Sequence, residues 1–409
     1  MKLRLLLVLA LLAALAPAGA SARAPEADQS ENIKLIGRFP YVNSEPPDTE
    51  AAVLNAGTDI AFSGKYVYAM QQGKDGGIHT FENAKSGPKE VGFFACPGGQ
   101  NDVAVVKPGL LIIGYHETQC GGPGAGVRLV DVRNAKHPTL LGAVNDLPGG
   151  THTVTPYPGK DIVYASPGGL ANGNGIEQII DVSDPAKPKV AATFTPQRIG
   201  CHDLSFYFNK DEKLAICAGG GEAEVWDVSD PLVPVAIGHV AVPAQFPHSV
   251  AFTPDGKYFV IGDEAVSVND CVGGPTGSLW VYDFAVREAP LLVGHFGPQR
   301  GVYPAGSGEL PDNPVLGPPR YSWCTAHLFN FVPGTYTMVA SWYGGGVNVI
   351  DFSDPTMPTE IAHYMGTGDD YTNYWSAYWY DGRIWANDRY TGGLDVFEVK
   401  GLKEGKIGR

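Results

Sequence analysis

One phrase recurs along this chain and constrains its fold more than any other feature. The phrase is a β-rich run that ends in Asp or Glu, followed by a turn, a Pro and a second β-rich run. The acidic ends lie 49, 50, 46, 56, 68 and 47 residues apart. They are Glu82, Asp131, Asp181, Asp227, Asp283, Asp351 and Glu398. Copies at this spacing occupy most of the chain and indicate a repeat architecture.

Each copy predicts one blade of a β-propeller. Upstream of the phrase, a segment such as residues 248–252 leads through a turn at Asp255 and Gly256 to another strand. Four short strands per copy, joined by turns rich in Gly, Pro and Asp, are typical of propeller blades. We therefore expect an all-β fold, a seven-bladed β-propeller with four-stranded blades over residues 33–399. With 53 Gly and 33 Pro, the composition excludes a helical bundle.

The last copy lacks its fourth strand. After Glu398 the chain runs into residues rich in Lys and Gly. Residues 33–39 have the same pattern as residues 290–296, the fourth strand of the fifth copy. We predict that the N-terminal strand closes the last blade, opposite residues 394–398, so that no sheet edge is left open. Residues 23–32 are expected to form a flexible N-terminus and residues 400–409 a C-terminal tail.

The turn after the acidic residue carries a further signature. It reads Asp-Val-Ser-Asp-Pro at 181–185 and 227–231, and Asp-Phe-Ser-Asp-Pro at 351–355. With these phrases the chain resembles the LVIVD-repeat proteins, which are secreted or surface β-propellers. The resemblance implies the fold and says little about function, because propellers host many activities. We expect the repeated Asp residues to cap the turn through Asx turns.

The first 22 residues have the pattern of a secretory signal peptide. Lys2 and Arg4 precede an apolar run that is too short to span a bilayer, and Ala20 to Ala22 form a small-residue cleavage site. We expect a secreted or periplasmic protein without membrane insertion, and a monomer. Loss of Lys2 and Arg4 takes the formal net charge from −14 to −16. So acidic a chain is a poor partner for nucleic acid, which needs a basic face.

All six cysteines lie in the part expected to be exported, where disulfides form. Six cysteines allow 15 pairings. Aligning the copies places two cysteines on the rim of the second blade, two in the fourth blade, and two between the fifth and sixth blades. The predicted pairs are Cys96 with Cys120, Cys201 with Cys217, and Cys271 with Cys324.

The chemistry-bearing residues gather at one position, which we call the axial position: the start of the innermost strand of each blade. Aligned by blade, it reads Thr58, Asn101, His152, His202, His248, His327 and Ser376. Inner strands surround the propeller axis, so these side chains are expected to converge. Several neutral imidazoles suit Cu, Fe or Zn. The alternative is that each His only satisfies backbone groups at the start of its strand.

Further polar groups are expected at the same channel mouth, where they would orient the ligands of a metal. They come from the ends of second strands or from positions next to the axial one. They are His116, Asp59, Asp102, Asp203, Asp263, Glu264, Asn387 and Asp388.

Aromatic residues near the same rim suit a small molecule or a glycan. Some lie in or beside the insertion at 297–323, which we expect to be a lid. The candidate contacts are Tyr321, Trp323, Trp342, Tyr343, Tyr374 and Trp375. Propeller packing is the alternative role for each of them.

The leading hypothesis is a metal-dependent oxidoreductase acting on a small molecule. A non-enzymatic scaffold for a protein or glycan partner is the alternative. A hydrolase of sugars or esters stays open, because carboxylates are plentiful at the rim. The sequence contains no Gly-x-Ser-x-Gly and no His-Glu-x-x-His, which disfavours serine hydrolases and zincins.

Overall fold

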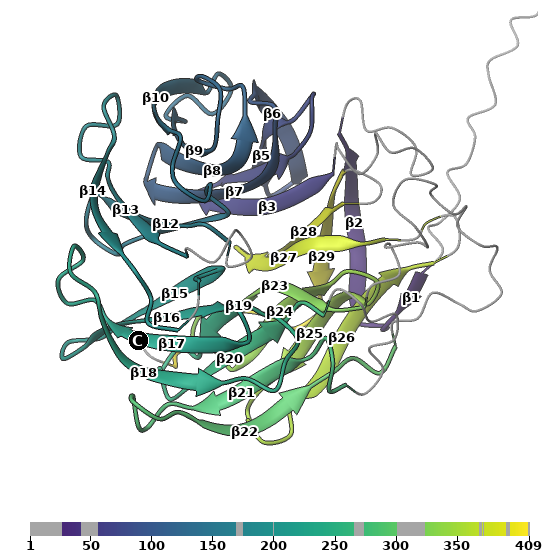
Figure 1. Cartoon of the computed structure of the whole chain (residues 1–409). Helices are drawn as coiled ribbons and strands as arrows, with labels where there is room; N and C mark the ends of the chain where they lie inside the picture. The colour runs from purple at the N-terminus through teal and green to yellow at the C-terminus, as the bar shows by residue number, and fades with distance from the viewer. Residues whose placement is uncertain are drawn as a thin grey trace, which may run out of the picture.

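The computed structural model describes residues 27–41, 56–168, 175–198, 200–265, 274–300, 324–367, 370, 372–389 and 393–407. These residues form seven antiparallel sheets arranged around one axis (Figure 1). The first strands of neighbouring sheets lie side by side around that axis. The predicted seven-bladed β-propeller is therefore confirmed.

The strands are counted from the axis outward in each blade. Blade 1 contains β3 (Gly57–Ser63), β4 (Tyr66–Gln71), β5 (Gly77–Ala84) and β6 (Gly87–Ala95), and blade 2 contains β7 (Gly98–Lys107), β8 (Leu110–Thr118), β9 (Gly126–Asp131) and β10 (Thr139–Asn145). Blade 3 contains β11 (Thr153–Pro156), β12 (Ile162–Ser166), β13 (Glu177–Asp181) and β14 (Lys189–Phe194), and blade 4 contains β15 (Asp203–Phe208), β16 (Lys213–Gly219), β17 (Glu222–Asp227) and β18 (Val235–Ala241). Blade 5 contains β19 (Pro247–Phe252), β20 (Tyr258–Asp263), β21 (Leu279–Asp283) and β22 (Leu291–Phe296), and blade 6 contains β23 (Ala326–Phe331), β24 (Thr337–Trp342), β25 (Gly346–Asp351) and β26 (Thr359–Gly366). Blade 7 contains β27 (Tyr374–Tyr380), β28 (Arg383–Asp388), β29 (Gly393–Val399) and β2 (Ile33–Pro40).

Strand β2 closes the ring, as predicted. It pairs antiparallel with β29, from Ile33 opposite Val399 to Pro40 opposite Gly393. The register shifts between Leu35 and Gly37, and the outer strand of every other blade carries a shift at the corresponding place. The N-terminal strand is thus the equivalent of the other outer strands rather than an accidental neighbour.

The structure also contains a strand that the sequence pattern does not reveal. β1 (Ala27–Gln29) pairs with β26 and gives blade 6 a fifth strand. These residues belong to the segment 23–32 that we expected to be flexible. The exposed edge of β26 accepts them, and Nε2 of His363 lies 3.1 Å from the Asp28 carboxylate. An edge strand binds a short extended segment mainly through backbone groups, which leave little trace in sequence.

The turns between the third and fourth strands are Asx turns, as expected. Asp181 Oδ1 accepts a hydrogen bond of 2.9 Å from the Ser183 amide, and Asp227 Oδ1 accepts one of 2.9 Å from the Ser229 amide. These turns pack against the outer strand of the preceding blade. A Cβ on Gly142 would lie 2.5 Å from the Pro185 carbonyl oxygen, so the small residue allows the two blades to approach.

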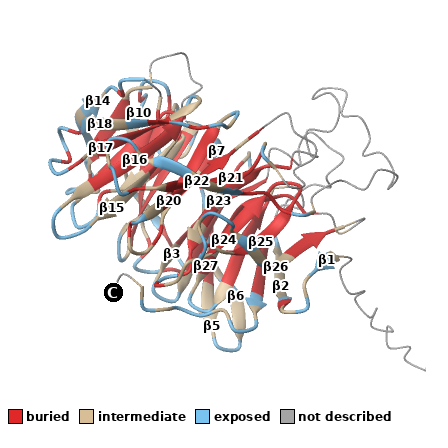
Figure 2. Cartoon of the chain, turned by 90° about the horizontal axis from the view of Figure 1, so that it is seen from below, coloured by how far each residue is buried: buried red, intermediate tan, exposed pale blue. Residues whose placement is uncertain are grey.

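The hydrophobic core is divided among the blade interfaces. Seven clusters of buried side chains occur among the described residues, each shared by two adjacent blades. In Figure 2 the buried residues follow the strands, and the exposed ones gather at turns and outer edges. Closure matters for this reason, because the cluster between blades 7 and 1 includes Tyr41 and packs against Ile36 and Phe39 of β2.

The residues after β29 are held against blade 6. The Gly405 and Ile407 amides donate to the carbonyls of Pro333 and Gly334, both at 2.9 Å. The expected C-terminal tail is therefore docked in its described part, residues 400–407. No helix long and apolar enough to cross a membrane occurs in the described parts of the chain.

Two disulfides join the cysteines that the blade alignment pairs. Cys96 is bonded to Cys120 with Cα atoms 4.9 Å apart, and Cys201 to Cys217 with Cα atoms 5.4 Å apart. Cys324 is also disulfide-bonded. Its predicted partner, Cys271, lies outside the described residues, as do residues 1–22 and most of the insertion at 297–323.

Deleting residues 23–40 should open the ring. Blade 7 then loses its outer strand and part of the core that it shares with blade 1. The melting temperature should fall by roughly 5 °C or more. Deleting residues 23–30 is the control, because it removes β1 and leaves β2 in place. Equal melting temperatures for the two deletions would contradict this role of β2.

Non-reducing peptide mapping should recover three disulfide-linked peptide pairs: Cys96 with Cys120, Cys201 with Cys217, and Cys271 with Cys324. The pairs follow the blade alignment, which assigns the two members of each pair to the same blade or to adjacent blades. A cross-linked peptide that joins Cys120 to Cys201 would show that the blade alignment is wrong.

Candidate metal centre

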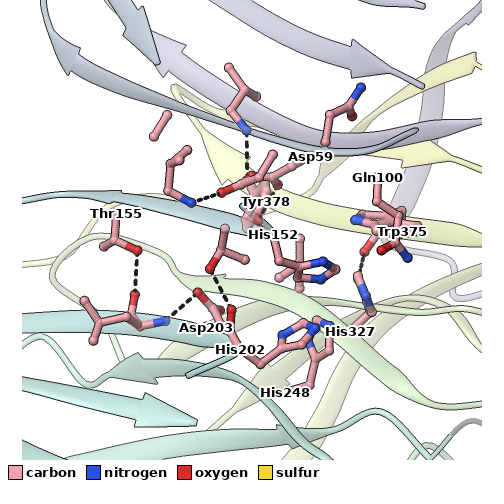
Figure 3. A pocket seen from close by; sticks show the side chains of 18 of the residues that line it. Asp59, Gln100, His152, Thr155, His202, Asp203, His248, His327, Trp375 and Tyr378 are labelled. Carbon is pink, nitrogen blue, oxygen red and sulfur yellow. Dashed lines mark hydrogen bonds between the residues drawn. The ribbon is translucent and has the colours of Figure 1, made fainter. Parts of the chain in front are cut away.

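Four imidazoles converge at the axis, where the innermost strands begin (Figure 3). The rings of His152 and His202 are 4.1 Å apart between centroids, those of His202 and His248 4.0 Å, and those of His248 and His327 4.2 Å. They form a continuous arc across blades 3 to 6. The axial position thus brings together the four histidines that the sequence singled out.

The arc has a fifth member at its outer end. Nε2 of His116, near the end of β8, lies 2.9 Å from Nδ1 of His152. The sequence placed His116 on the same rim, and the structure puts it in contact with the first axial His. Because Nδ1 of His152 is engaged with His116, Nε2 of His152 is the nitrogen left for a ligand at the axis.

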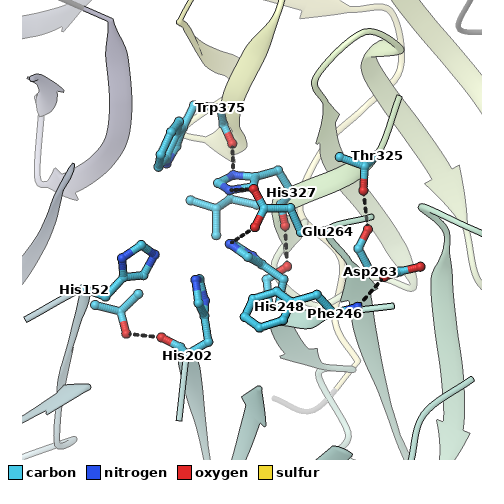
Figure 4. Close-up of polar contacts among 12 residues, drawn as sticks. His152, His202, Phe246, His248, Asp263, Glu264, Thr325, His327 and Trp375 are labelled. Carbon is cyan, nitrogen blue, oxygen red and sulfur yellow. Dashed lines mark hydrogen bonds and ion pairs between the residues drawn. The ribbon is translucent and has the colours of Figure 1, made fainter. Parts of the chain in front are cut away.

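The backbone around the arc is fixed by side chains from the preceding blade. Thr153 Oγ1 donates to the His202 carbonyl at 2.6 Å, and Ser249 Oγ donates to the His327 carbonyl. Nδ1 of His327 lies 2.5 Å from the Trp375 carbonyl oxygen, to which it donates (Figure 4). That bond selects the tautomer in which Nε2 of His327 carries the lone pair.

Burial keeps the arc uncharged. It holds the pKa values of His152, His202, His248 and His327 well below the ordinary value of about 6.5. Neighbouring imidazoles lower these pKa values further, since two adjacent cations would repel. Neutral imidazole is the form that ligates a metal. Nδ1 of His202 and Nδ1 of His248 are buried and have no hydrogen-bond partner among the described residues.

Glu264 occupies a more direct place than the sequence suggested. Its carboxylate oxygens lie 3.5 Å from Nε2 of His248 and 3.6 Å from Nε2 of His327, between the two rings (Figure 4). Tyr343 donates its hydroxyl to Glu264 at 2.9 Å. Burial raises the pKa of Glu264 to about 7, against the opposing effects of Tyr343 and Arg389. We expected Glu264 to orient ligands, whereas here it contacts the ligand nitrogens themselves.

The donor atoms form two overlapping groups that could hold an ion. One is His152, His202 and His248, and the other is His248, Glu264 and His327, with the atoms of each group within 4.8 Å of one another. Two donors, each about 2.1 Å from an ion at the tetrahedral angle, are about 3.4 Å apart. Each imidazole of the second group lies near this distance from a different oxygen of Glu264, with 3.5 Å from Nε2 of His248 to Oε2 and 3.6 Å from Nε2 of His327 to Oε1. The second group is therefore the better candidate to hold an ion.

A cavity of ≈ 250 Å³ adjoins the arc and reaches a layer of carboxylates. Asp59, Asp102 and Asp203 follow the axial position in their blades, and the Tyr378 hydroxyl donates to Asp59 at 2.7 Å. Burial raises the pKa of Asp203 to about 7. Asp102 accepts the Val154 amide at 2.6 Å, and Asp203 accepts that of Leu204 at 2.7 Å. Asp59 and Asp102 thus join inner strands of neighbouring blades, whereas Asp203 accepts an amide of its own strand.

Two other predicted rim carboxylates serve the loops. Asp263 accepts the amides of Gln245 and Phe246 at 3.0 and 2.9 Å, just before His248, and that of Gly277 at 2.9 Å. Asp388 is fully buried and accepts the Asn373 amide at 3.4 Å. Both carboxylates position segments that lead to inner strands.

The candidate aromatic contacts divide into two sets. Trp375 lines the cavity, and both it and Tyr343 lie against His327, with centroid distances of 4.8 and 4.6 Å. The other two described residues are core residues: Trp342 donates its indole N–H to the Gly277 carbonyl, and Tyr374 its hydroxyl to Asp395. Tyr321 and Trp323 lie outside the described residues.

Sequence reasoning missed three residues near the site. Gln100 and Tyr378 line the cavity. Gln100 directly precedes the axial residue Asn101, and Tyr378 lies two residues after the axial residue Ser376. Arg389 follows β28, and its guanidinium lies over the rings of Tyr343 and Trp375, 4.6 and 5.3 Å from their centroids. Asn387 and Asp388, which directly precede Arg389, were predicted at the end of a second strand near the channel mouth. The same alignment could therefore have identified Arg389 as a residue of the channel mouth.

Comparison with protein families gives one match. The model for the LVIVD repeat matches residues 171–195 and 331–366. The first match covers the outer part of blade 3 and the second most of blade 6, each including an Asp-x-Ser-Asp-Pro turn. No curated protein matches this sequence.

Ser249→Ala should lower the free energy of unfolding by about 1–3 kcal/mol, because it leaves the buried His327 carbonyl without its donor. Thr356→Ala is the matched control. It also removes a donated hydroxyl bond, but from an exposed turn, and should cost about 0.5 kcal/mol or less. Chemical denaturation in the presence of EDTA measures both. Equal losses of unfolding free energy would show that the buried bond to the His327 carbonyl stabilises the fold no more than an exposed hydroxyl bond does.

Proposed function

The chain is an LVIVD-repeat β-propeller, and from that premise we propose that it is a metal-dependent oxidoreductase whose metal centre lies on the propeller axis. The observation that carries the proposal is Glu264, set between His248 and His327 at ligand-to-ligand distances. Two imidazoles and one carboxylate with positions left open are typical of non-haem Fe(II) oxygenases, and similar sets bind Zn. Iron is therefore the metal that we propose first.

The surroundings of this group support a resident metal. His327 donates Nδ1–H to the Trp375 carbonyl, and Tyr343 donates to Glu264. Such outer contacts orient metal ligands in known sites. A metal would also compensate the burial of three titratable groups side by side, which is otherwise unfavourable.

Redox chemistry is proposed ahead of hydrolysis because two imidazoles and one carboxylate form the donor set of non-haem Fe(II) oxygenases. Two of the cavity carboxylates serve the fold: Asp102 accepts the Val154 amide of the next blade, and Asp59 accepts the Tyr378 hydroxyl. The protein would hold the metal, exclude bulk water and leave room for a small molecule in the cavity.

Elemental analysis of untagged protein, purified without chelators, should find about one metal ion per chain, iron or copper under this proposal. His248→Ala should lower that content at least about tenfold, since His248 belongs to both donor groups. His239→Ala is the control, because His239 is exposed on the outer strand β18.

Three further variants distinguish the donor groups. If the ion sits with Glu264, then His327→Ala and Glu264→Gln lose the metal and His152→Ala keeps it; the other group gives the reverse. Zinc alone would favour the hydrolase. Protein without metal, in wild type and all variants alike, would end the proposal and leave the binding scaffold.

A further inference from the structure

A second cavity opens at the channel mouth, separate from the four axial histidines. Its volume is ≈ 520 Å³, within the range of small-molecule sites. Residues from the rim of blades 1 and 2 form one wall, and Trp375 and Arg389 of blade 7 form another. Much of the first wall is Pro97, Gly98 and Gly99, which offer apolar surface and backbone.

Arg389 is a cation prepared for a ligand. Its guanidinium lies over Tyr343 and Trp375 and also interacts with the Tyr343 hydroxyl, and its five N–H groups allow a further partner. Its backbone amide donates to the Asn373 carbonyl at 2.9 Å, which fixes the residue at the rim. No carboxylate in the described part of the chain forms an ion pair with Arg389.

The mouth cavity is locally cationic in an acidic protein. Lys74 and Arg389 line it together with a single carboxylate, Glu117, which is exposed. The whole chain carries a formal charge of −14. Lys74 lies 4.0 Å from Asp75 and is mostly exposed, so Arg389 is the charge that a ligand inside the cavity would meet.

We propose that the mouth cavity binds a small organic anion, an apolar or aromatic carboxylate, whose carboxylate pairs with Arg389 and whose body lies against Trp375. The planar fork of arginine matches a carboxylate through two parallel N–H bonds. Its role as the substrate subsite rests on the proposed function, whereas anion binding itself does not depend on a metal.

The two cavities adjoin each other through shared walls. Gln100 and Trp375 line both of them. Trp375 lies against the ring of His327, and Figure 3 shows Gln100 and Trp375 at the same side of the arc. A carboxylate held by Arg389 therefore places the rest of a short molecule beside the His248, Glu264 and His327 group. Arg389 would act in this way as a specificity-determining residue.

The test measures binding without requiring turnover. Benzoate is titrated into the protein by calorimetry, with benzamide and benzylamine as neutral and cationic analogues of the same shape. Benzoate should bind at least about tenfold more tightly than either analogue, because only the anion forms the charge-assisted pair. Tighter binding of benzylamine would overturn the proposal and assign the cavity to Glu117.

Variants locate the site. Arg389→Gln should weaken benzoate binding about tenfold or more, and Arg389→Lys less, since lysine keeps the charge and loses the fork. Arg198→Gln, which changes an arginine that is paired with Glu222 and does not line the mouth cavity, should leave binding unchanged. No detectable benzoate binding, or equal binding by wild type and Arg389→Gln, would overturn the proposal.

Repeating the titration after EDTA treatment separates this proposal from the metal centre. Benzoate binding should persist in EDTA-treated protein, since none of the four axial histidines lines the mouth cavity. If the protein contains no metal but binds benzoate through Arg389, the oxidoreductase proposal is wrong and the anion site is supported. If the protein contains its metal but does not bind benzoate, the anion-site proposal is wrong and the metal centre is supported.

Discussion

The structure depends on a belt of side-chain hydrogen bonds that joins the innermost strands around the axis. In the described residues, neighbouring blades share no β-ladder beyond one isolated bridge between Gly73 and Gly98, so the inner edges of the sheets would otherwise leave polar groups without partners. Short polar side chains at or near the axial position supply them. Ser205 Oγ donates to the Val250 carbonyl at 2.7 Å, and Ser376 Oγ to the Thr58 carbonyl at 2.8 Å. The second of these bonds joins the last blade to the first.

The same belt explains why the axial imidazoles can be buried. A His ring inside a protein needs partners for its nitrogens or a ligand that replaces them. Two of the belt bonds end on the carbonyls of His202 and His327 and so set the direction in which these rings leave the backbone. The rings then meet at the axis rather than packing between blades. The same histidines therefore stabilise the fold through their backbone carbonyls and form the candidate metal site through their imidazoles.

Repetition made much of this predictable. A feature that occurs once per copy, such as the Asx turn or the axial position, can be read by alignment within one sequence. Ring closure followed from counting strands, because one copy lacked its fourth strand and residues 33–39 had the right pattern. The convergence of His152, His202, His248 and His327 followed from the architecture alone, since equivalent positions on inner strands surround the axis.

The details that escaped prediction lie where the copies differ. Glu264 was expected at the channel mouth, but it stands one residue past β20, beyond the repeated strand pattern, so its place between His248 and His327 could not be read from the repeat. Arg389 belongs to a single blade, so no repeat draws attention to it. Trp342 and Tyr374 looked like rim aromatics, yet alternation along their strands sends both into the core. β1 was missed because pairing at an outer edge uses backbone groups that any residue possesses.

The pairing of β2 with β29 has a consequence for biosynthesis. Ile33 and Val399 are opposite each other, so a strand made early must wait for one made almost last. Joining segments so far apart in sequence is entropically slow. Until then blade 7 is incomplete, and β2 exposes an unpaired edge of the kind that promotes aggregation. We expect a nascent chain of this protein to be a chaperone client until its final blade emerges, and prematurely terminated chains to be recognised by quality-control proteases.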